Sequence, residues 1–211
     1  MSETSDPIFA RVAERYDLIN RLLSAGRDQA WRARATQWLP RGRVVDLGSG
    51  TGAAAPLLEG HEAVALDPVR AMLGMSPMKL RVVGVGEALP FRDGSVDGVF
   101  SAYVLRNLTS VDETLAEVHR VLRPGGVMAI VDLGRPLRLL PRRIHRIGTA
   151  VTLPVIGLLA KAPADYWYLH QSLDKLAPPE ELLSKSPLRL ERVWRMGLFG
   201  FVYGALLVKD R

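Results

Sequence analysis

The sequence predicts an α/β fold with a parallel sheet and helices on both of its faces. Two observations support this prediction. Short apolar segments that are typical of strands alternate with helical segments, and a glycine-rich turn follows the first strand directly. Alternation of this kind produces a parallel sheet, because each crossover helix packs back on one face of the sheet. The five strands predicted from this pattern are 43–47, 63–66, 81–85, 98–102 and 127–132.

Helices are predicted on both sides of these strands. The clearest covers 111–122, where the apolar residues share one face: Leu115, Val118, Val121 and Leu122. Another covers 27–38 and ends before Pro40. The crossovers near 57–61 and 74–79 are short, so one or two helices there should be stubby.

Further segments are predicted before and after these five strands. A helical cap is predicted over 1–39, and a helical insertion, or lid, over 134–175 after the fifth strand. Two further strands, 188–194 and 201–208, are separated by a short turn only and should form a hairpin. We therefore expect a single domain over 1–211 with a seven-stranded sheet in which one strand is antiparallel.

Composition narrows the class of protein. The chain has 211 residues, of which 48% are hydrophobic, and this is enough for one domain with a sizeable core. It has no cysteine, so disulfides and thiolate metal sites are excluded, and the histidines show no metal-ligand spacing. The polar N-terminus has no signal-peptide pattern. The apolar stretch 147–160 is shorter than the roughly 18 residues that span a bilayer. These features favour a cytoplasmic protein without a metal.

The net charge of +6 comes from an excess of basic residues in one segment. Segment 134–163 has no acidic residue and contains six basic ones: Arg135, Arg138, Arg142, Arg143, Arg146 and Lys161. This distribution argues against a nucleic-acid partner, because enzymes that act on nucleic acids more often spread basic charge around the cofactor cleft or along an appended domain. On a helix, Arg138, Arg142 and Arg146 share one face. That face is either solvated or in contact with an anionic membrane surface, to which each basic residue contributes about 1 kcal/mol.

The glycine-rich turn and an acidic residue beyond it point to a nucleoside-containing cofactor. Asp46 precedes the turn, and Gly48, Gly50 and Gly52 allow the backbone to turn tightly and approach a ligand. Asp67 ends the second strand about 20 residues later, where a carboxylate can accept hydrogen bonds from ribose hydroxyls.

The turn alone fits two cofactors. Its Gly48-x-Gly50-x-x-Ala53 pattern satisfies a dinucleotide fingerprint. Asp46, at a position that is usually apolar in dinucleotide sites, together with Thr51, instead makes the pattern D-x-G-x-G-T-G. This pattern resembles motif I of class I S-adenosylmethionine-dependent methyltransferases. In this reading the Asp46 carboxylate orients the loop and the ammonium group of the cofactor.

More distant motifs carry a more specific resemblance. They are Tyr16-Asp17-Leu18-Ile19-Asn20, Trp31-Arg32, Glu87-Ala88-Leu89-Pro90-Phe91, Leu105-Arg106-Asn107 and Tyr166-Trp167-Tyr168-Leu169-x-x-Ser172. Together they resemble the C-methyltransferases of menaquinone and ubiquinone biosynthesis over nearly the whole chain. The resemblance implies the Rossmann-like seven-stranded sheet of class I methyltransferases, with S-adenosylmethionine as cofactor and a prenylated quinol as substrate.

The resemblance also implies roles for individual residues. Thr51 and Asp67 match cofactor-binding positions, and Tyr16 covers the cofactor from the N-terminal helix. The remaining cofactor positions fall on Val85, Gly86 and Ala102. The family usually has an acidic or amide residue followed by Ala at Val85-Gly86, so backbone groups or Glu87 would have to recognise adenine. The predicted substrate contacts are Tyr166, Tyr168 and Ser172, and the alternative for the two tyrosines is packing within the core or the lid.

Arg106 and Asn107 are the predicted catalytic residues. Methylation of a ring carbon requires an electron-rich ring, which forms when a quinol hydroxyl loses its proton. A positive charge near the oxygen favours the phenolate, so Arg106 is assigned electrostatic stabilisation and Asn107 a contact to a ring oxygen. A guanidinium is itself a poor base. The alternative is structural: Arg106 pairs with a carboxylate such as Asp132 or Asp165, and Asn107 caps the following helix.

The resulting functional hypothesis is a cytoplasmic enzyme, peripheral on the inner face of a membrane, that C-methylates a prenylated quinol. Two alternatives remain. One is a methyltransferase for another lipid or small molecule, such as a phospholipid amine, which the residues Val85, Ala102 and Val104 leave open. The other is a non-catalytic cofactor-binding scaffold. The sequence leaves open whether the protein is a monomer or a homodimer.

Overall fold

The computed structural model describes residues 24, 26–134, 177–197 and 200–211, together with four single positions between 140 and 150. Several sequence-based assignments lie outside these residues. They include the N-terminal helix before residue 24, most of the insertion predicted over 134–175, and the individual positions Tyr16, Arg138, Arg142, Arg146, Tyr166, Tyr168 and Ser172.

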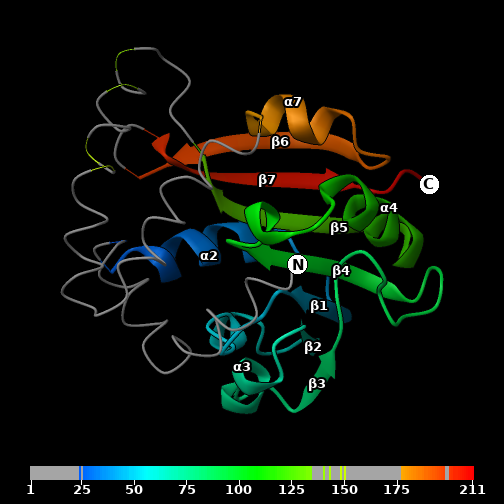
Figure 1. The fold of residues 1–211 in the computed structure, drawn as a ribbon. Coiled ribbons are helices and arrows are strands. Elements are labelled where there is room, and N and C mark those ends of the chain that lie inside the picture. The colour runs from blue at the N-terminus through cyan, green and yellow to red at the C-terminus, as the bar shows by residue number, and fades with distance from the viewer. Residues whose placement is uncertain are drawn as a thin grey trace.

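The described residues form a seven-stranded sheet (Figure 1), as the sequence predicts. The strand order is β3-β2-β1-β4-β5-β7-β6, and the first five strands in this order run parallel to one another. β7 is antiparallel to both β5 and β6, which confirms the predicted hairpin. The strands are β1 (Arg43–Leu47), β2 (Glu62–Asp67), β3 (Leu80–Val83), β4 (Val96–Ala102), β5 (Leu122–Leu133), β6 (Arg189–Met196) and β7 (Val202–Val208).

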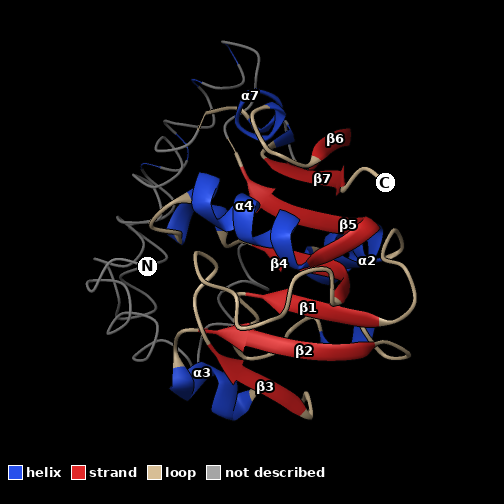
Figure 2. Ribbon diagram, turned by 90° about the vertical axis from the view of Figure 1, so that its right-hand side faces the viewer, coloured by secondary structure: helices blue, strands red, loops and turns tan. Residues whose placement is uncertain are grey.

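Helices cover both faces of the sheet (Figure 2). One face packs against α4 (Val111–Val121) and α7 (Pro179–Ser184). The other packs against α2 (Asp28–Thr36), the 3₁₀ turn η1 (Ala55–Leu57) and α3 (Arg70–Met75). The short η1 and α3 are the stubby helices that the sequence predicts. A second 3₁₀ turn, η2 (Leu105–Asn107), follows β4.

Strand alternation builds two hydrophobic cores. Val45 and Leu47 face the α4 side, whereas Val44 faces the α2 side, because successive side chains point to opposite faces. Leu115, Val118 and Val121 of α4 are at most 1% exposed, which confirms the predicted apolar face of that helix. At about 25 cal/mol per Å² of buried apolar surface, these two layers are the main favourable contribution to folding.

The start of β5 differs from the prediction. The sequence places the strand at 127–132, with Arg123-Pro124-Gly125-Gly126 as a preceding turn, whereas β5 begins at Leu122. Leu122 pairs with Val96 of β4, and Gly125 donates a hydrogen bond to the Lys209 carbonyl at the end of the chain. These partners are distant in sequence, so local turn signals do not indicate them.

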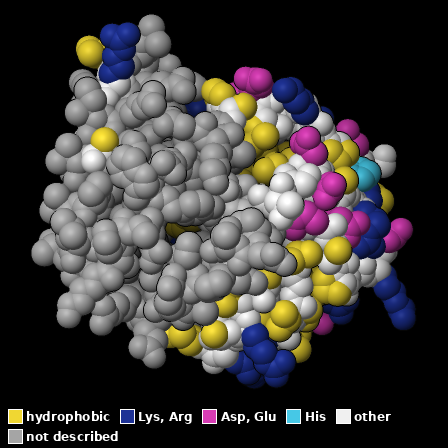
Figure 3. Space-filling model, in the orientation of Figure 1, with side chains coloured by type: hydrophobic (Ala, Val, Ile, Leu, Met, Phe, Trp, Pro, Cys, Tyr) yellow, Lys and Arg dark blue, Asp and Glu magenta, His cyan; other side chains and the backbone are white. Residues whose placement is uncertain are grey.

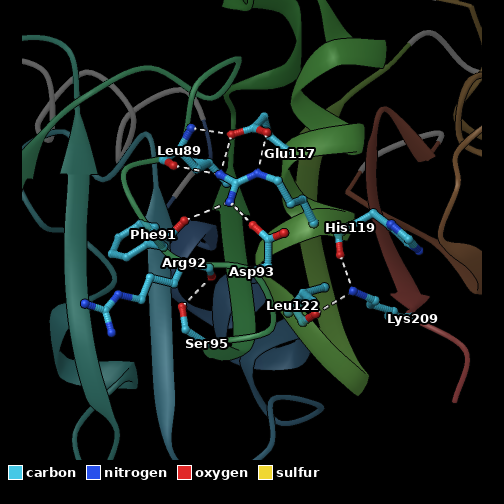
Figure 4. Close-up of polar contacts among 10 residues, drawn as sticks. Leu89, Phe91, Arg92, Asp93, Ser95, Glu117, His119, Leu122 and Lys209 are labelled. Atoms are coloured by element: carbon cyan, nitrogen blue, oxygen red, sulfur yellow. Dashed lines mark hydrogen bonds and ion pairs between the residues drawn. The ribbon is translucent and has the colours of Figure 1, made fainter.

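Arg120 of α4 holds the segment between β3 and β4 through contacts to Leu89, Phe91 and Asp93, which Figure 4 labels. Its guanidinium donates to the carbonyl oxygens of Leu89 and Phe91, both at 2.9 Å, and to the carboxylates of Glu117 and Asp93. Glu117 Oε2 in turn accepts from the Leu89 amide at 2.8 Å. The loop that leads from β3 is therefore held against α4 by backbone and side-chain contacts together.

Two further features of the described part of the protein are the lengths of its helices and the distribution of its surface charge. Within the described part of the chain, no helix is long and apolar enough to cross a membrane. On the described part of the face in Figure 3, basic and acidic side chains are interspersed. This agrees with the sequence, in which the basic excess lies in segment 134–163.

Candidate active site

The turn between β1 and η1 requires glycine. Gly48, Gly50 and Gly52 have φ of 68°, 55° and 82°, a region in which side chains with a Cβ are strained. A Cβ on Gly48 would also lie 2.3 Å from Cγ2 of Val104, and one on Gly52 would lie 2.4 Å from Oγ of Ser76. The turn is thus closely packed as well as tightly bent.

Asp67 connects this turn to the end of β2. Its Oδ2 accepts a hydrogen bond from the Gly50 amide at 2.9 Å, and its Oδ1 accepts one from the Val69 amide at 2.8 Å. The residue is 8% exposed and lies on the wall of the adjacent cleft. An ionised carboxylate only accepts hydrogen bonds, so the groups that bind it are donors.

A cleft of about 760 Å³, counting the space at its mouth, lies at the carboxyl ends of β1, β2 and β4. This is where ligands bind in open α/β sheets. The structure brings eight of the predicted site residues to its wall: Gly48, Gly50, Thr51, Asp67, Val85, Gly86, Ala102 and Asn107. Asp46 and Arg106 are not part of the wall.

Asp46 lies behind the wall, at the end of β1. It is 2% exposed, and its Oδ2 has no hydrogen-bond partner among the described residues. Burial raises the pKa of Asp46 from 3.8 to about 7, because the charged form loses its hydration. The positive charge of Arg32 opposes this shift, and the negative charge of Asp67 adds to it.

Arg32 and Tyr103 line the cleft, although neither is among the site residues predicted from the sequence. Arg32 comes from α2, and its guanidinium lies 5.0 Å from the centre of the Tyr103 ring. Tyr103 follows β4 directly and has a φ of 66°, which is uncommon for a bulky residue and is typical of functional sites. The signal for Arg32 in the sequence was its place in Trp31-Arg32, one of the motifs that carry the family resemblance.

Arg106 forms an ion pair with Asp132. Its Nη1 lies 3.0 Å from Asp132 Oδ1, and the two side chains are 11% and 0% exposed. The pairing is the structural alternative that the sequence left open for this residue. Asp132 also accepts hydrogen bonds from the Leu105 and Leu133 amides, so it joins the segment after β4 to the end of β5.

Asn107 does not cap the following helix. Ser110 is the N-cap of α4 and accepts a hydrogen bond from the Glu113 amide at 3.2 Å, so this part of the structural alternative is wrong. Asn107 instead donates from Nδ2 to the Tyr103 carbonyl, and its buried Oδ1 has no partner in the described part of the chain.

The far end of the cleft is built from the segment after β3. Gly86 has no room for a side chain, because a Cβ would lie 2.8 Å from Cγ2 of Thr114. Glu87 is next to it, and its Oε1 accepts hydrogen bonds from the Thr109 and Ser110 amides. This wall therefore offers backbone groups, with Val85 in place of a polar side chain.

With this geometry in place, comparison with known proteins identifies the family. Residues 2–185 match the model of the ubiE/COQ5 methyltransferase family. The chain belongs to that family. The fold and the family make this protein an S-adenosylmethionine-dependent methyltransferase, as the motifs predict.

Relatives of this methyltransferase align with most of its length. A demethylmenaquinone methyltransferase of Thermus thermophilus is 34% identical, over 97% of this chain and all of the relative. One from Deinococcus radiodurans is 36% identical over 83% of this chain and 79% of the relative. A ubiquinone/menaquinone biosynthesis C-methyltransferase UbiE of Geobacter sulfurreducens is 34% identical over 82% of this chain and 75% of the relative.

Solved structures of methyltransferases share the fold. A Thermotoga maritima S-adenosylmethionine-dependent methyltransferase, described as a possible histamine N-methyltransferase, has a TM-score of 0.69 at 19% identity and covers 96% of this chain and 98% of its own. Phosphoethanolamine N-methyltransferase 2 of Haemonchus contortus, with S-adenosylmethionine bound, has a TM-score of 0.66 at 17% identity, over 96% of this chain and 57% of its own.

Proposed function

We propose that this methyltransferase transfers a methyl group from S-adenosylmethionine to a ring carbon of a prenylated quinol such as demethylmenaquinol. The observation that carries the proposal is the relationship to the Thermus thermophilus demethylmenaquinone methyltransferase, which extends over 97% of this chain. A cleft with the polar groups that the reaction needs supports it.

The residues of the cleft fit this cofactor. Four buried polar atoms at or directly behind the wall lack hydrogen-bond partners within the described residues: Arg32 Nε, Asp46 Oδ2, Ser49 Oγ and Asn107 Oδ1. Native proteins rarely leave such atoms unpaired, so a polar ligand accounts for them. Asp67 would hold the ribose, the turn from Gly48 to Thr51 the amino-acid end, and the backbone at Val85 and Gly86, with Ala102, the adenine.

When bound, S-adenosylmethionine supplies an electrophilic methyl group on a sulfonium. The protein's own contribution is to orient the quinol and to favour transfer of one hydroxyl proton to water; after methyl transfer, the ring carbon loses its own proton to water and the aromatic ring is restored. In our proposal Asn107 Oδ1 orients the ring by accepting a hydrogen bond from the quinol hydroxyl that keeps its proton. Arg106, held by Asp132, adds positive charge at this edge of the sheet, which lowers the pKa of the hydroxyl. Tyr16, Tyr166, Tyr168 and Ser172 remain proposed contacts to the cofactor and the substrate.

A prenylated quinol resides in a bilayer, so we also propose that the basic segment 134–163 contacts an anionic membrane surface. Two described positions in it, Leu140 and Arg143, are exposed, with Leu140 at 69%. An exposed leucine beside basic residues suits an interfacial helix. Substituting Arg138, Arg142 and Arg146 by Glu should weaken sedimentation with anionic liposomes. Equal sedimentation of the variant and the wild type would contradict membrane contact through these residues.

Methyl transfer from labelled cofactor tests the proposed function. Purified protein is incubated with demethylmenaquinol, with its oxidised quinone, or with phosphatidylethanolamine, each in the same liposomes. We expect label only in the quinol sample, because the oxidised ring lacks the hydroxyl. Label in phosphatidylethanolamine would indicate the lipid-amine alternative. Cofactor binding without transfer to any acceptor would indicate a scaffold.

A further inference from the structure

Arg32 is a buried cation without a counterion in the described part of the chain. It is 6% exposed, lines the cleft and forms no ion pair with any described residue, and its Nε has no hydrogen-bond partner there. The ring of Tyr103, 5.0 Å from the guanidinium, attracts it but satisfies none of its N–H donors. A buried arginine is normally paired, because removal of a lone charge from water is costly. The position therefore suits an anionic ligand group.

Asp46 is the complementary feature. It is 2% exposed, and its Oδ2 also lacks a partner among the described residues. Arg32 and Asp46 interact electrostatically, yet they do not form an ion pair with each other. A basic and an acidic side chain are thus buried close to the same glycine turn without an ion pair between them. A ligand that carries a positive and a negative group at one end matches this arrangement.

We propose that Arg32 binds the α-carboxylate of the cofactor's amino-acid end, while Asp46 provides the charge that balances its ammonium group. This inference rests on the proposed function, since it takes S-adenosylmethionine to be the ligand. A guanidinium donates two parallel hydrogen bonds to a carboxylate, which gives both affinity and orientation. The nearby Asp46 favours the zwitterionic amino-acid end over the other anionic group in the reaction, the phenolate of the acceptor.

Two ligands that differ only at the amino-acid end test the proposal by calorimetry. S-adenosylhomocysteine has the carboxylate and ammonium groups, whereas 5′-methylthioadenosine has neither. Arg32→Met should weaken binding of S-adenosylhomocysteine by about 10- to 100-fold, since charged hydrogen bonds are lost. Binding of 5′-methylthioadenosine should stay within about twofold of wild type, which also shows that the variant is folded.

Two further variants sharpen the comparison. Arg32→Lys keeps the charge but loses the forked geometry, so its affinity for S-adenosylhomocysteine should fall between those of wild type and Arg32→Met. Arg34→Met removes an exposed arginine from the same helix and should bind both ligands as wild type does.

Each contrary outcome has a distinct meaning. Equal losses for the two ligands in Arg32→Met would show a general disturbance of the cleft and overturn the proposal. Unchanged affinity for S-adenosylhomocysteine with reduced methyl transfer would assign Arg32 to the acceptor, which also overturns it but leaves the proposed function intact. Failure of the wild-type protein to bind either ligand would contradict the proposed function itself.

Discussion

Arg106 and Asp132 form a 3.0 Å ion pair that joins the segment after β4 to the end of β5. Asp132 is fully buried and also accepts hydrogen bonds from the Leu105 and Leu133 amides. Arg106 is therefore held in one position by a rigid partner at the same sheet edge as the cleft. This arrangement accounts both for its structural role and for the charge that we propose it adds to the site.

Asp132→Asn should destabilise the protein by about 3–5 kcal/mol, because it leaves the Arg106 charge buried without its partner. Urea unfolding measures this change. Glu62→Gln is a matched control, since its ion pair with Arg43 is exposed and such pairs contribute about 1 kcal/mol or less. Similar losses in the two variants would contradict the importance of the buried pair.

Asp46 should make stability depend on pH. Between its ordinary pKa of 3.8 and about 7, the folded protein keeps a proton on Asp46 that the unfolded chain has released. Stability should therefore fall as the pH rises through this window, by up to about 1.4 kcal/mol per pH unit, and level off above it.

Urea unfolding from about pH 4 to about pH 8 compares wild type with Asp46→Asn, which should lack this contribution. Glu59→Gln, a change at an exposed acid, should keep the wild-type profile. If the Asp46→Asn profile parallels that of wild type, the proposed titration of Asp46 is incorrect.

Gly86 and Thr114 should be energetically coupled. Gly86→Ala places a Cβ 2.8 Å from Thr114 Cγ2, and such overpacking costs about 1–3 kcal/mol. Thr114→Ala removes the obstacle, so the double variant should be less destabilised than the sum of the single variants by about 1 kcal/mol. Additive losses in urea unfolding would show that the two positions do not meet.

Arg120 should control the order of the segment from Leu89 to Asp93. Arg120→Met removes donors to the Leu89 and Phe91 carbonyls and to two carboxylates. Amide hydrogen exchange should then accelerate in this segment. Lys209→Met removes contacts to the carbonyls of His119 and Leu122, also at the C-terminal end of α4 (Figure 4), but none to the segment from Leu89 to Asp93, so exchange in that segment should stay unchanged. Unchanged exchange in Arg120→Met would contradict the fastening role.

Much of the fold follows from local patterns in the sequence. Apolar segments of strand length predict all seven strands, and the periodicity of α4 predicts the face that this helix buries. The beginning of β5 is the exception, because Leu122 and Gly125 obtain their partners from Val96 and Lys209, which lie far away in the chain.

The site was less completely predictable. Glycine geometry and the spacing to Asp67 locate the turn, because both are local. Arg32 escaped assignment because its neighbours, Asp46 and Tyr103, belong to other elements, and only the fold brings the three together. The sequence left two roles open for Arg106, electrostatic stabilisation of the substrate and pairing with a carboxylate. The structure shows the pair with Asp132, which lies 26 residues away and which the local motif does not indicate.

The position of the transferred methyl group tests the central claim most directly. The protein is incubated with demethylmenaquinol and S-adenosylmethionine that carries a deuterated methyl group, and the product is analysed by mass spectrometry and NMR. The account predicts one deuterated methyl group on a ring carbon, in place of that carbon's hydrogen. A label on a ring oxygen, or no labelled quinol at all, would contradict it.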